Sequence, residues 1–350
     1  MTHTNDFRSD AMQSRYARQT VLKEIGEAGQ KKLAAATVVI IGLGAIGTNS
    51  ANFLARAGAG TLRLVDRDVV DWSNLQRQSL FEEEDAARSL PKAEAASRHL
   101  KRINAALCYE PIIEDVNSGN IERIVAGASV VVDGLDNFYA RALVNQACVK
   151  HKIPWIYGAC LGTYGIAATI IPGVSACLHC LLPDAGEATT PPLSCETVGV
   201  LGPAAGVIAA LQSAEALKIM VGNSAATSPY LIHAGLWDND FSELPAVRVS
   251  GCEVCGQHKY GLLESGSRMA AASLCGRDAV QVMPPAAFTM DFDLLRETLG
   301  RIFKLEENAY LLKFHVNGME VMVFHDGRAM IFGTSDPQAA LALYGKYIGG

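Results

Sequence analysis

Three glycines stand at the spacing GxGxxG in the segment Gly42-Leu43-Gly44-Ala45-Ile46-Gly47. Glycines at this spacing let a backbone turn approach a phosphate, and free N–H groups at the start of a following helix attract its negative charge. Asp66 comes 24 residues after Gly42, where a carboxylate can hydrogen-bond ribose hydroxyls. A tight turn without a ligand is the alternative. The pattern favours a nucleotide site and suits NAD, FAD or ATP; no GxxxxGK[ST] sequence occurs, which argues against a P-loop NTPase.

Charged residues farther along the chain separate these nucleotides. Arg77 lies in Asn74-Leu75-Gln76-Arg77-Gln78, Lys92 opens an expected helix, and Asp136 lies in Asp133-Gly134-Leu135-Asp136-Asn137. Arg77 and Lys92 could neutralise charge on a triphosphate and on leaving pyrophosphate, while Asp136 could hold Mg²⁺. Taken singly, each is more often a solvated surface charge. Because hydride transfer needs no such cations, the set favours ATP with Mg²⁺.

Two CxxC pairs, Cys177/Cys180 and Cys252/Cys255, could supply four thiolates. Four thiolates complete a closed tetrahedral site for structural Zn²⁺. A redox dithiol is the alternative for either pair alone. The chain has nine cysteines, an odd number, which favours metal or sulfur chemistry in a reducing compartment over disulfides.

Cys195 lies between an expected loop and an expected helix, where the helix terminus can lower a thiol pKa. It could act as a nucleophile toward an acyl-adenylate, or it could be an inessential thiol. The remaining cysteines show no partner spacing and are expected to be small core residues; they are Cys108, Cys148, Cys160 and Cys275.

The elements that must position these residues alternate between strand and helix. Thr37 to Ile41 reads as a strand that breaks on Gly42, and Ala45 to Gly58 has helical spacing. Further strands are expected at 61–65, 112–116 and 129–132, with helices at 91–104, 121–126 and 137–150. This alternation predicts a Rossmann-like, doubly wound α/β sheet with helices on both faces.

The second half changes in character. Residues 154–171 are β-rich, 199–221 predict a long helix, 230–233 form a short apolar segment, and 261–268 read as a linker. Beyond it, a helix at 291–299 and strands at 310–316 and 320–324 across Asn317-Gly318 predict a small α+β domain. We therefore expect two domains, 1–263 and 264–350.

Composition limits the partners and the compartment. The 350 residues are 49% hydrophobic and 19% charged with a net charge of −6, and no dense Lys/Arg block marks a nucleic-acid or membrane surface. The first ten residues lack an apolar signal-peptide core. The longest uncharged apolar stretch, Val198 to Leu211, is too short to cross a bilayer and reads as a buried helix. A cytoplasmic protein is expected.

Four short motifs resemble those of a known protein family. They are Arg15-Tyr16-Ala17-Arg18-Gln19, Asn74 to Gln78, Pro91-Lys92 and Asp136-Asn137. With the glycine loop and the cysteine pairs, they resemble the ubiquitin-activating E1-like enzymes of the ThiF, MoeB and HesA type over Arg15 to Gln257. The loop has Ala45 where the family often has glycine, a mild departure.

The resemblance implies MgATP-dependent adenylation of the C-terminal Gly-Gly carboxylate of a ubiquitin-like sulfur-carrier protein of the ThiS or MoaD type. It implies a homodimer in which Arg18 reaches the phosphates of the other subunit, zinc on the four cysteines, and a mobile-loop role for Cys195. The remaining implied contacts place Asp66 on the ribose, Asn74, Arg77 and Lys92 on the triphosphate, and Asp136 on Mg²⁺.

Several alternatives stay open. The resemblance leaves thiamine, molybdopterin or related sulfur transfer as the pathway, and no rhodanese-type domain is visible, so a separate sulfur donor is expected. Adenylation of a ribosomal peptide, an NAD-dependent oxidoreductase and a non-catalytic carrier-binding scaffold are the rival functions. The chain's last residues, Ile348-Gly349-Gly350, could mimic the substrate tail or could be a frayed terminus.

Overall fold

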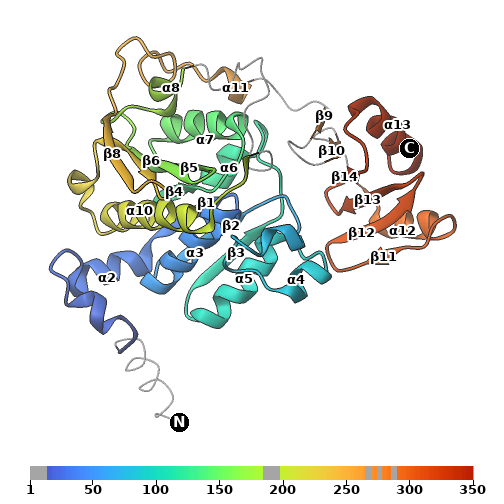
Figure 1. Ribbon diagram of the computed structural model, residues 1–350, viewed down its shortest axis with the longest axis horizontal. Coiled ribbons are helices and arrows are strands. Elements are labelled where there is room, and N and C mark those ends of the chain that lie inside the picture. Colours follow the sequence, from blue (N-terminus) through green and yellow to red (C-terminus); the bar gives the residue numbers. More distant parts are fainter. Residues whose placement is uncertain (1–13, 184–197, 265–269, 274–277, 285–289, 350) are drawn as a thin grey trace. The chain divides into compact units, whose positions relative to one another are not determined.

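The computed structural model describes residues 14–183, 198–264, 270–273, 278–284 and 290–349 (Figure 1). The chain forms two compact units, and the first of them ends at Glu264. No helix in the described ranges is long and apolar enough to cross a membrane.

The first unit is built on an eight-stranded sheet in the order β3-β2-β1-β4-β5-β6-β7-β8. Strands β1 to β5 are parallel to one another, and β6 to β8 extend the sheet in antiparallel fashion. Because β1 and β4 are buried on both faces, they read as Val/Ile runs without alternation. The strands are β1 (Thr37–Ile41), β2 (Thr61–Val65), β3 (Cys108–Ile112), β4 (Val130–Asp133), β5 (Trp155–Leu161), β6 (Tyr164–Ile170), β7 (Tyr230–Gly235) and β8 (Asp240–Pro245).

Helices cover both faces of this sheet (Figure 1). Apolar residues of α3 and α10 pack against β6 and β7, and those of α6 and α7 pack in a second cluster with β1, β4 and β5. The helices are α2 (Gly26–Ala35), α3 (Ala45–Ala57), η1 (Trp72–Asn74), α4 (Glu83–Ala87), α5 (Lys92–Ile103), α6 (Ile121–Val125), α7 (Phe138–His151), α8 (Leu178–Leu181), α10 (Gly202–Met220), η2 (Ser224–Ala226) and α11 (Gly261–Glu264). The doubly wound α/β fold expected from the sequence is confirmed.

The second unit has a six-stranded antiparallel sheet in the order β11-β12-β13-β14-β10-β9. Asn317 and Gly318 connect β12 to β13 with φ values of 52° and 78°, as a two-residue hairpin turn requires. The elements are β9 (Ala270–Ser273), β10 (Ala279–Met283), α12 (Phe292–Gly300), β11 (Glu306–Glu307), β12 (Leu311–Val316), β13 (Met319–Phe324), β14 (Ala329–Phe332) and α13 (Pro337–Tyr347). The expected hairpin and α+β character are confirmed.

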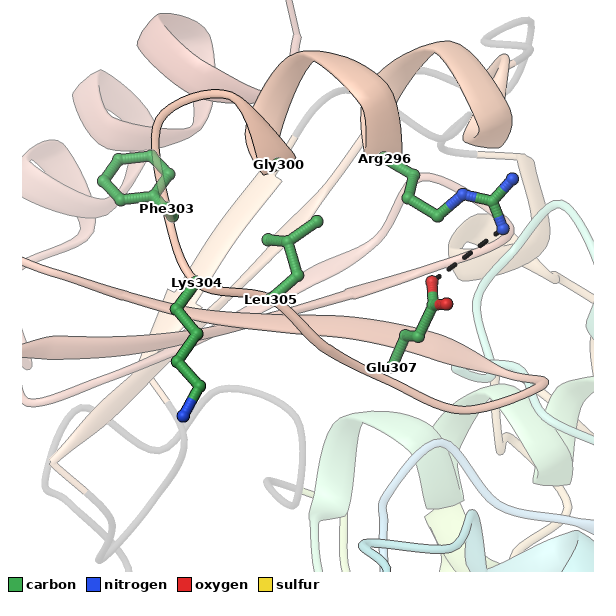
Figure 2. Close-up of a pocket in the computed structure, with 6 residues that line it drawn as sticks. All are labelled: Arg296, Gly300, Phe303, Lys304, Leu305 and Glu307. Atoms are coloured by element: carbon green, nitrogen blue, oxygen red, sulfur yellow. Dashed lines mark ion pairs between the residues drawn. The ribbon is translucent and has the colours of Figure 1, made fainter.

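A surface hollow of about 430 Å³ lies in this second unit (Figure 2). Its lining includes Arg296, whose Nη1 lies 3.8 Å from Oε2 of Glu307. None of the site residues expected from the sequence lines it; the lining is completed by Gly300, Phe303, Lys304 and Leu305. Near the end of the chain, Ile348 is buried in the core of this unit; Gly350 lies outside the described residues.

Two local predictions were wrong. The strand expected at 112–116 is β3, which ends at Ile112; Pro111 within it is tolerated because β3 is an edge strand of the sheet. The expected linker begins with helix α11, in which the Leu262 N–H donates to Oε1 of Gln146 at 3.0 Å. Residues 265–268 of that linker lie outside the described residues.

Candidate functional site

The candidate site lies between β1 and β4, where the order of the parallel strands in the sheet reverses. From β1 the chain moves to β2 and β3 on one side, and from β4 it moves to β5 on the other. In such sheets, ligands bind in the crevice at the carboxyl ends of the two central strands. The glycine loop follows β1, Asp66 follows β2, and Asp136 lies in the loop after β4. The structure therefore brings these predicted residues together at the carboxyl ends of the parallel strands.

Backbone packing accounts for two glycines of the loop but not for the third. Gly42 has φ +88°, and a Cβ on Gly47 would lie 1.9 Å from the Gly42 carbonyl oxygen. A Cβ on Gly134 would lie 2.2 Å from the same oxygen, so the loops after β1 and β4 are in close contact. By contrast, the nearest atom to a Cβ on Gly44 is 3.6 Å away, an ordinary contact. Glycine at 44 is therefore not required by the protein's own packing.

Asp66 shapes the glycine loop. Its carboxylate accepts hydrogen bonds from the N–H of Leu43 at 2.6 Å and of Asp68 at 2.7 Å. Burial raises the pKa of Asp66, and the positive charge of Lys92 opposes that rise. A carboxylate has about four acceptor positions, so these two bonds leave capacity for ribose hydroxyls.

Lys92 and Arg67 bring positive charge beside Asp66. Lys92 is the first residue of α5, and its buried Nζ lies 3.2 Å from Oδ2 of Asp68. Nη1 of Arg67 donates to Oδ1 of Asp115 at 3.0 Å. Burial alone would lower the pKa of Arg67, but the nearby carboxylates, Asp115 foremost, hold it above its usual value. Sequence reasoning missed Arg67 and Asp115, although the position of Arg67 next to Asp66 was a signal.

The Asn74–Gln78 segment follows β2 through η1. Asn74 is buried, and its Oδ1 accepts the Asp71 N–H at 3.1 Å in a reciprocal cap. Arg77 is partly exposed, and its Nη1 donates to the Ser73 carbonyl oxygen at 2.7 Å. The Asn74 side chain therefore stabilises the turn, and the Arg77 side chain is hydrogen-bonded to the backbone of the same turn.

Asp136 and Asn137 form the tip of the loop after β4. Asp136 is exposed, and its Oδ1 accepts a hydrogen bond from Nδ2 of Asn137 at 3.3 Å. Asn137 caps α7 by accepting the Ala140 N–H at 2.8 Å. Beneath the tip lies a buried ion pair that sequence reasoning missed, with Nε of Arg141 2.9 Å from Oδ2 of Asp133. Burial raises the pKa of Asp133, and the Arg141 charge opposes that rise.

Arg18 lies on the helix formed by residues 14–20. Tyr16 is buried and its hydroxyl accepts from Nδ2 of Asn104 at 2.9 Å, while Nε2 of Gln19 donates to the Ala57 carbonyl oxygen at 2.8 Å. Arg18 itself is exposed. Its neighbours anchor the helix and leave the Arg18 side chain at the surface.

The four cysteines of the two CxxC pairs come together. The Sγ atoms of Cys177 lie 3.8 Å from Cys180 and 3.7 Å from Cys252, and Cys180 lies 3.4 Å from Cys255. All four sulfur atoms lie within 4.8 Å of one another. Tetrahedral Zn–S bonds of about 2.3 Å place sulfur atoms roughly 3.8 Å apart. The Val249 N–H also donates to Sγ of Cys180 at 3.4 Å, as is common for metal thiolates.

Cys195 lies outside the described residues. Residues that follow Cys195 lie beside the Asn74–Gln78 segment, because the Leu201 N–H donates to the Gly162 carbonyl oxygen at 2.8 Å and a Cβ on Gly202 would lie 3.4 Å from the Gln76 carbonyl oxygen. Among the other cysteines, Cys148 is buried as expected, but Cys108 at the start of edge strand β3 is exposed.

A sheet of five parallel strands extended by antiparallel ones, with a glycine loop at its switch point and a carboxylate after the next strand, is typical of nucleotide-binding α/β proteins. Comparison with known proteins makes this specific. The ThiF family model matches residues 16–254, so the chain belongs to the ThiF family.

Two relatives and one solved structure illustrate the similarity. The chain is 42% identical to the sulfur carrier protein ThiS adenylyltransferase of Bacillus subtilis, over 97% of this chain and all of the relative. It is 35% identical to the molybdopterin-synthase adenylyltransferase of Escherichia coli, over 71% of this chain and 98% of the relative. The crystal structure of E. coli MccB matches with a TM-score of 0.61 and 26% identity, over 69% of this chain and 72% of that one.

Proposed function

We propose that this enzyme adenylates the C-terminal Gly-Gly carboxylate of a ubiquitin-like sulfur-carrier protein with MgATP. The observation that carries the proposal is the 42% identity to a ThiS adenylyltransferase over 97% of this chain and all of the relative. The ThiS adenylyltransferase of Escherichia coli is 38% identical over 69% of this chain, and the molybdopterin-synthase relative is 35% identical over 71% of it, so identity and not coverage separates the two types. We therefore favour a carrier of the ThiS type and thiamine biosynthesis over the MoaD type.

The reaction needs little chemistry from the protein. A carboxylate oxygen of the carrier attacks the α-phosphorus of ATP. The bond between the α-phosphorus and the oxygen that bridges it to the β-phosphorus breaks, which releases pyrophosphate. The carboxylate is already a nucleophile, so no general base is required, and catalysis rests on positioning and charge stabilisation.

Each predicted residue takes a role that its place allows. The backbone at Gly44, where packing does not require glycine, would approach the phosphates, and Asp66 would hold the ribose. Asn74 would order the turn that carries Arg77, and Arg77 and Lys92 would balance charge on the triphosphate. Asp136 would hold Mg²⁺, which supplies charge neutralisation between the phosphates when bound.

We further propose a homodimer in which Arg18 acts on the partner's nucleotide. The exposure of Arg18 on a helix anchored by Tyr16 and Gln19 supports this role. The sulfur donor would be a separate protein. Cys195 would act after adenylation, as a nucleophile toward the acyl-adenylate.

The cysteine cluster would hold a structural Zn²⁺. Its four ligands close the coordination shell, which leaves no position for water or substrate. Cys177 directly precedes α8 and Cys180 lies within it, whereas Cys252 and Cys255 follow β8, so zinc would join two segments far apart in the sequence.

Mass spectrometry of the carrier tests this function. Incubation with MgATP should yield a carrier C-terminal acyl-adenylate, trapped as the hydroxamate by hydroxylamine. The matched control is the same carrier without its last glycine, which should yield none. Equal labelling of both carriers, or of neither, would contradict the proposal, and labelling of a peptide alone would favour the ribosomal-peptide alternative.

A further inference from the structure

A buried ion pair lies directly beneath the loop that carries Asp136. Asp133 is the last residue of β4, and Arg141 lies in the first turn of α7. Their side chains are 0% and 6% exposed, and Nε of Arg141 lies 2.9 Å from Oδ2 of Asp133. The guanidinium also lies between the rings of Phe138 and Tyr157, 5.7 and 5.3 Å from their centroids.

The pair holds both backbone polar groups of the residue before Asp136. The Leu135 N–H donates to Oδ1 of Asp133 at 2.8 Å, and Nη2 of Arg141 donates to the Leu135 carbonyl oxygen at 2.6 Å. The same Nη2 donates to the Gly158 carbonyl oxygen on β5 at 3.0 Å. Leu135 is therefore fixed to the sheet at both of its peptide groups.

The other side of Asp136 and the base of the loop are fixed as well. Asn137 caps α7, and Nε2 of Gln212 on α10 donates to the Asp133 carbonyl oxygen at 2.9 Å. The exposed Asp136 carboxylate thus projects from a backbone that is held on both sides. Such rigidity suits a metal ligand, whose geometry tolerates little displacement.

Stability alone does not explain this pair. Removing two charges from water costs about as much as their attraction returns, and apolar residues of similar size often serve equally well. An apolar pair, however, could not hold the Leu135 N–H and carbonyl groups. The forked guanidinium of arginine can bind a carboxylate and two carbonyl groups at once, which a lysine ammonium cannot do with the same fixed geometry.

We propose that Asp133 and Arg141 are positioning residues of the adenylation site, which hold the Asp136 carboxylate where it can bind Mg²⁺ beside the triphosphate. The inference rests on the proposed function and adds two residues to its machinery. Neither touches substrate; both act through the backbone of Leu135.

Metal binding distinguishes this role from a purely structural one. We would measure Mn²⁺ affinity by electron paramagnetic resonance on the full-length protein, in the presence of a non-hydrolysable ATP analogue. The variants are Arg141→Lys, which keeps the charge but loses the fork, and Asp133→Asn, which keeps the shape but loses the charge. The control is Thr169→Val, which removes a buried 2.8 Å hydrogen bond to Oε2 of Glu215, outside this loop.

All three variants should lower the melting temperature. Arg141→Lys and Asp133→Asn should also weaken Mn²⁺ binding by about 10- to 100-fold, as loss of a group that orients a metal ligand typically does. Thr169→Val should bind Mn²⁺ like the wild type. If the two loop variants bind Mn²⁺ within twofold of the wild type, the inference is wrong; if one fails to fold, the other decides.

The variant Asp136→Asn distinguishes a failure of the metal role of Asp136 from a failure of the positioning role of Asp133 and Arg141. If this variant binds Mn²⁺ as the wild type does, the metal role of Asp136 fails and the inference fails with it. If Asp136→Asn weakens binding and the loop variants do not, only the positioning role is overturned. If the wild type adenylates the carrier but the variants do not show this loss of Mn²⁺ binding, the proposed reaction stands and the inference is refuted.

Discussion

At the scale of single residues, the site is set by what the backbone permits. The glycines at 42, 47 and 134 are required by close backbone contacts within and between two loops, whereas a Cβ at position 44 would make only an ordinary contact. The same GxGxxG pattern thus combines two glycines that the fold requires with one that it does not require. This division yields a matched pair of substitutions.

Gly47→Ala and Gly44→Ala should fail in different ways. Gly47→Ala places a Cβ against the Gly42 carbonyl oxygen and should destabilise the fold by about 1–3 kcal/mol or more, seen in thermal unfolding. Gly44→Ala should leave the melting temperature nearly unchanged and raise KM for ATP by about tenfold, the effect of roughly 1.4 kcal/mol of lost binding. Equal stability losses in both variants would contradict the distinction.

The sequence predicted the residues whose spacing is local and missed those whose meaning depends on burial. Gly42, Gly44, Gly47 and Asp66 follow strands, and such positions can be read from a pattern. Asp133 and Arg141 were missed because a charged residue is normally expected at the surface. Only the fold shows that β4 and α7 bring the two together in the interior.

At the scale of elements, the cysteine cluster joins α8 to the segment after β8. The sequence predicted this cluster because CxxC pairs have few other uses in a reducing compartment. The sequence placed the third strand at 112–116 instead of Cys108–Ile112, because Pro111 is disfavoured in strands in general and the edge position that permits it is a property of the sheet.

Cys177→Ala should release zinc from the purified protein and lower its melting temperature by at least about 5 °C, because bound metal contributes free energy of folding. Metal content and thermal unfolding would be measured together. Cys108→Ser is the matched control, since Cys108 is exposed and outside the cluster, and should change neither. One zinc per chain in Cys177→Ala would exclude the four-thiolate site.

At the scale of the whole molecule, the two units have separate apolar cores. The larger unit is organised around the clusters of its eight-stranded sheet, and the smaller one around its own antiparallel sheet. We propose that the domains expected from the sequence, 1–263 and 264–350, correspond to these units. The molybdopterin-synthase relative matches over 98% of its own length while covering 71% of this chain. An adenylating unit of that size therefore exists without a second unit.

Residues 1–264 alone should fold and form the acyl-adenylate. Truncation at Glu264 separates no residue of the candidate site from the others, so kcat should stay within about tenfold of the full chain. Single-turnover adenylation and circular dichroism would measure this. A folded fragment without activity would mean that the second unit takes part in the reaction.

The homodimer makes its own prediction. The variants Arg18→Ala and Asp136→Ala should each be inactive. An equal mixture of the two variants that exchanges subunits should recover roughly a quarter of the wild-type activity. Half of the dimers are then mixed, and each mixed dimer has one intact site. Adenylation assays before and after subunit exchange would measure the recovery. No recovery despite proven exchange would place Arg18 in its own subunit's site.

The central claim is adenylation of a Gly-Gly carrier, and ATP–pyrophosphate exchange tests it most directly. The purified protein would be assayed alone, with a carrier of the ThiS type, with one of the MoaD type, and with each carrier lacking its last glycine. The account predicts exchange with the intact ThiS-type carrier, at least about tenfold above every other arm. Exchange that does not depend on the carrier's last glycine, or no exchange with either carrier, would contradict it.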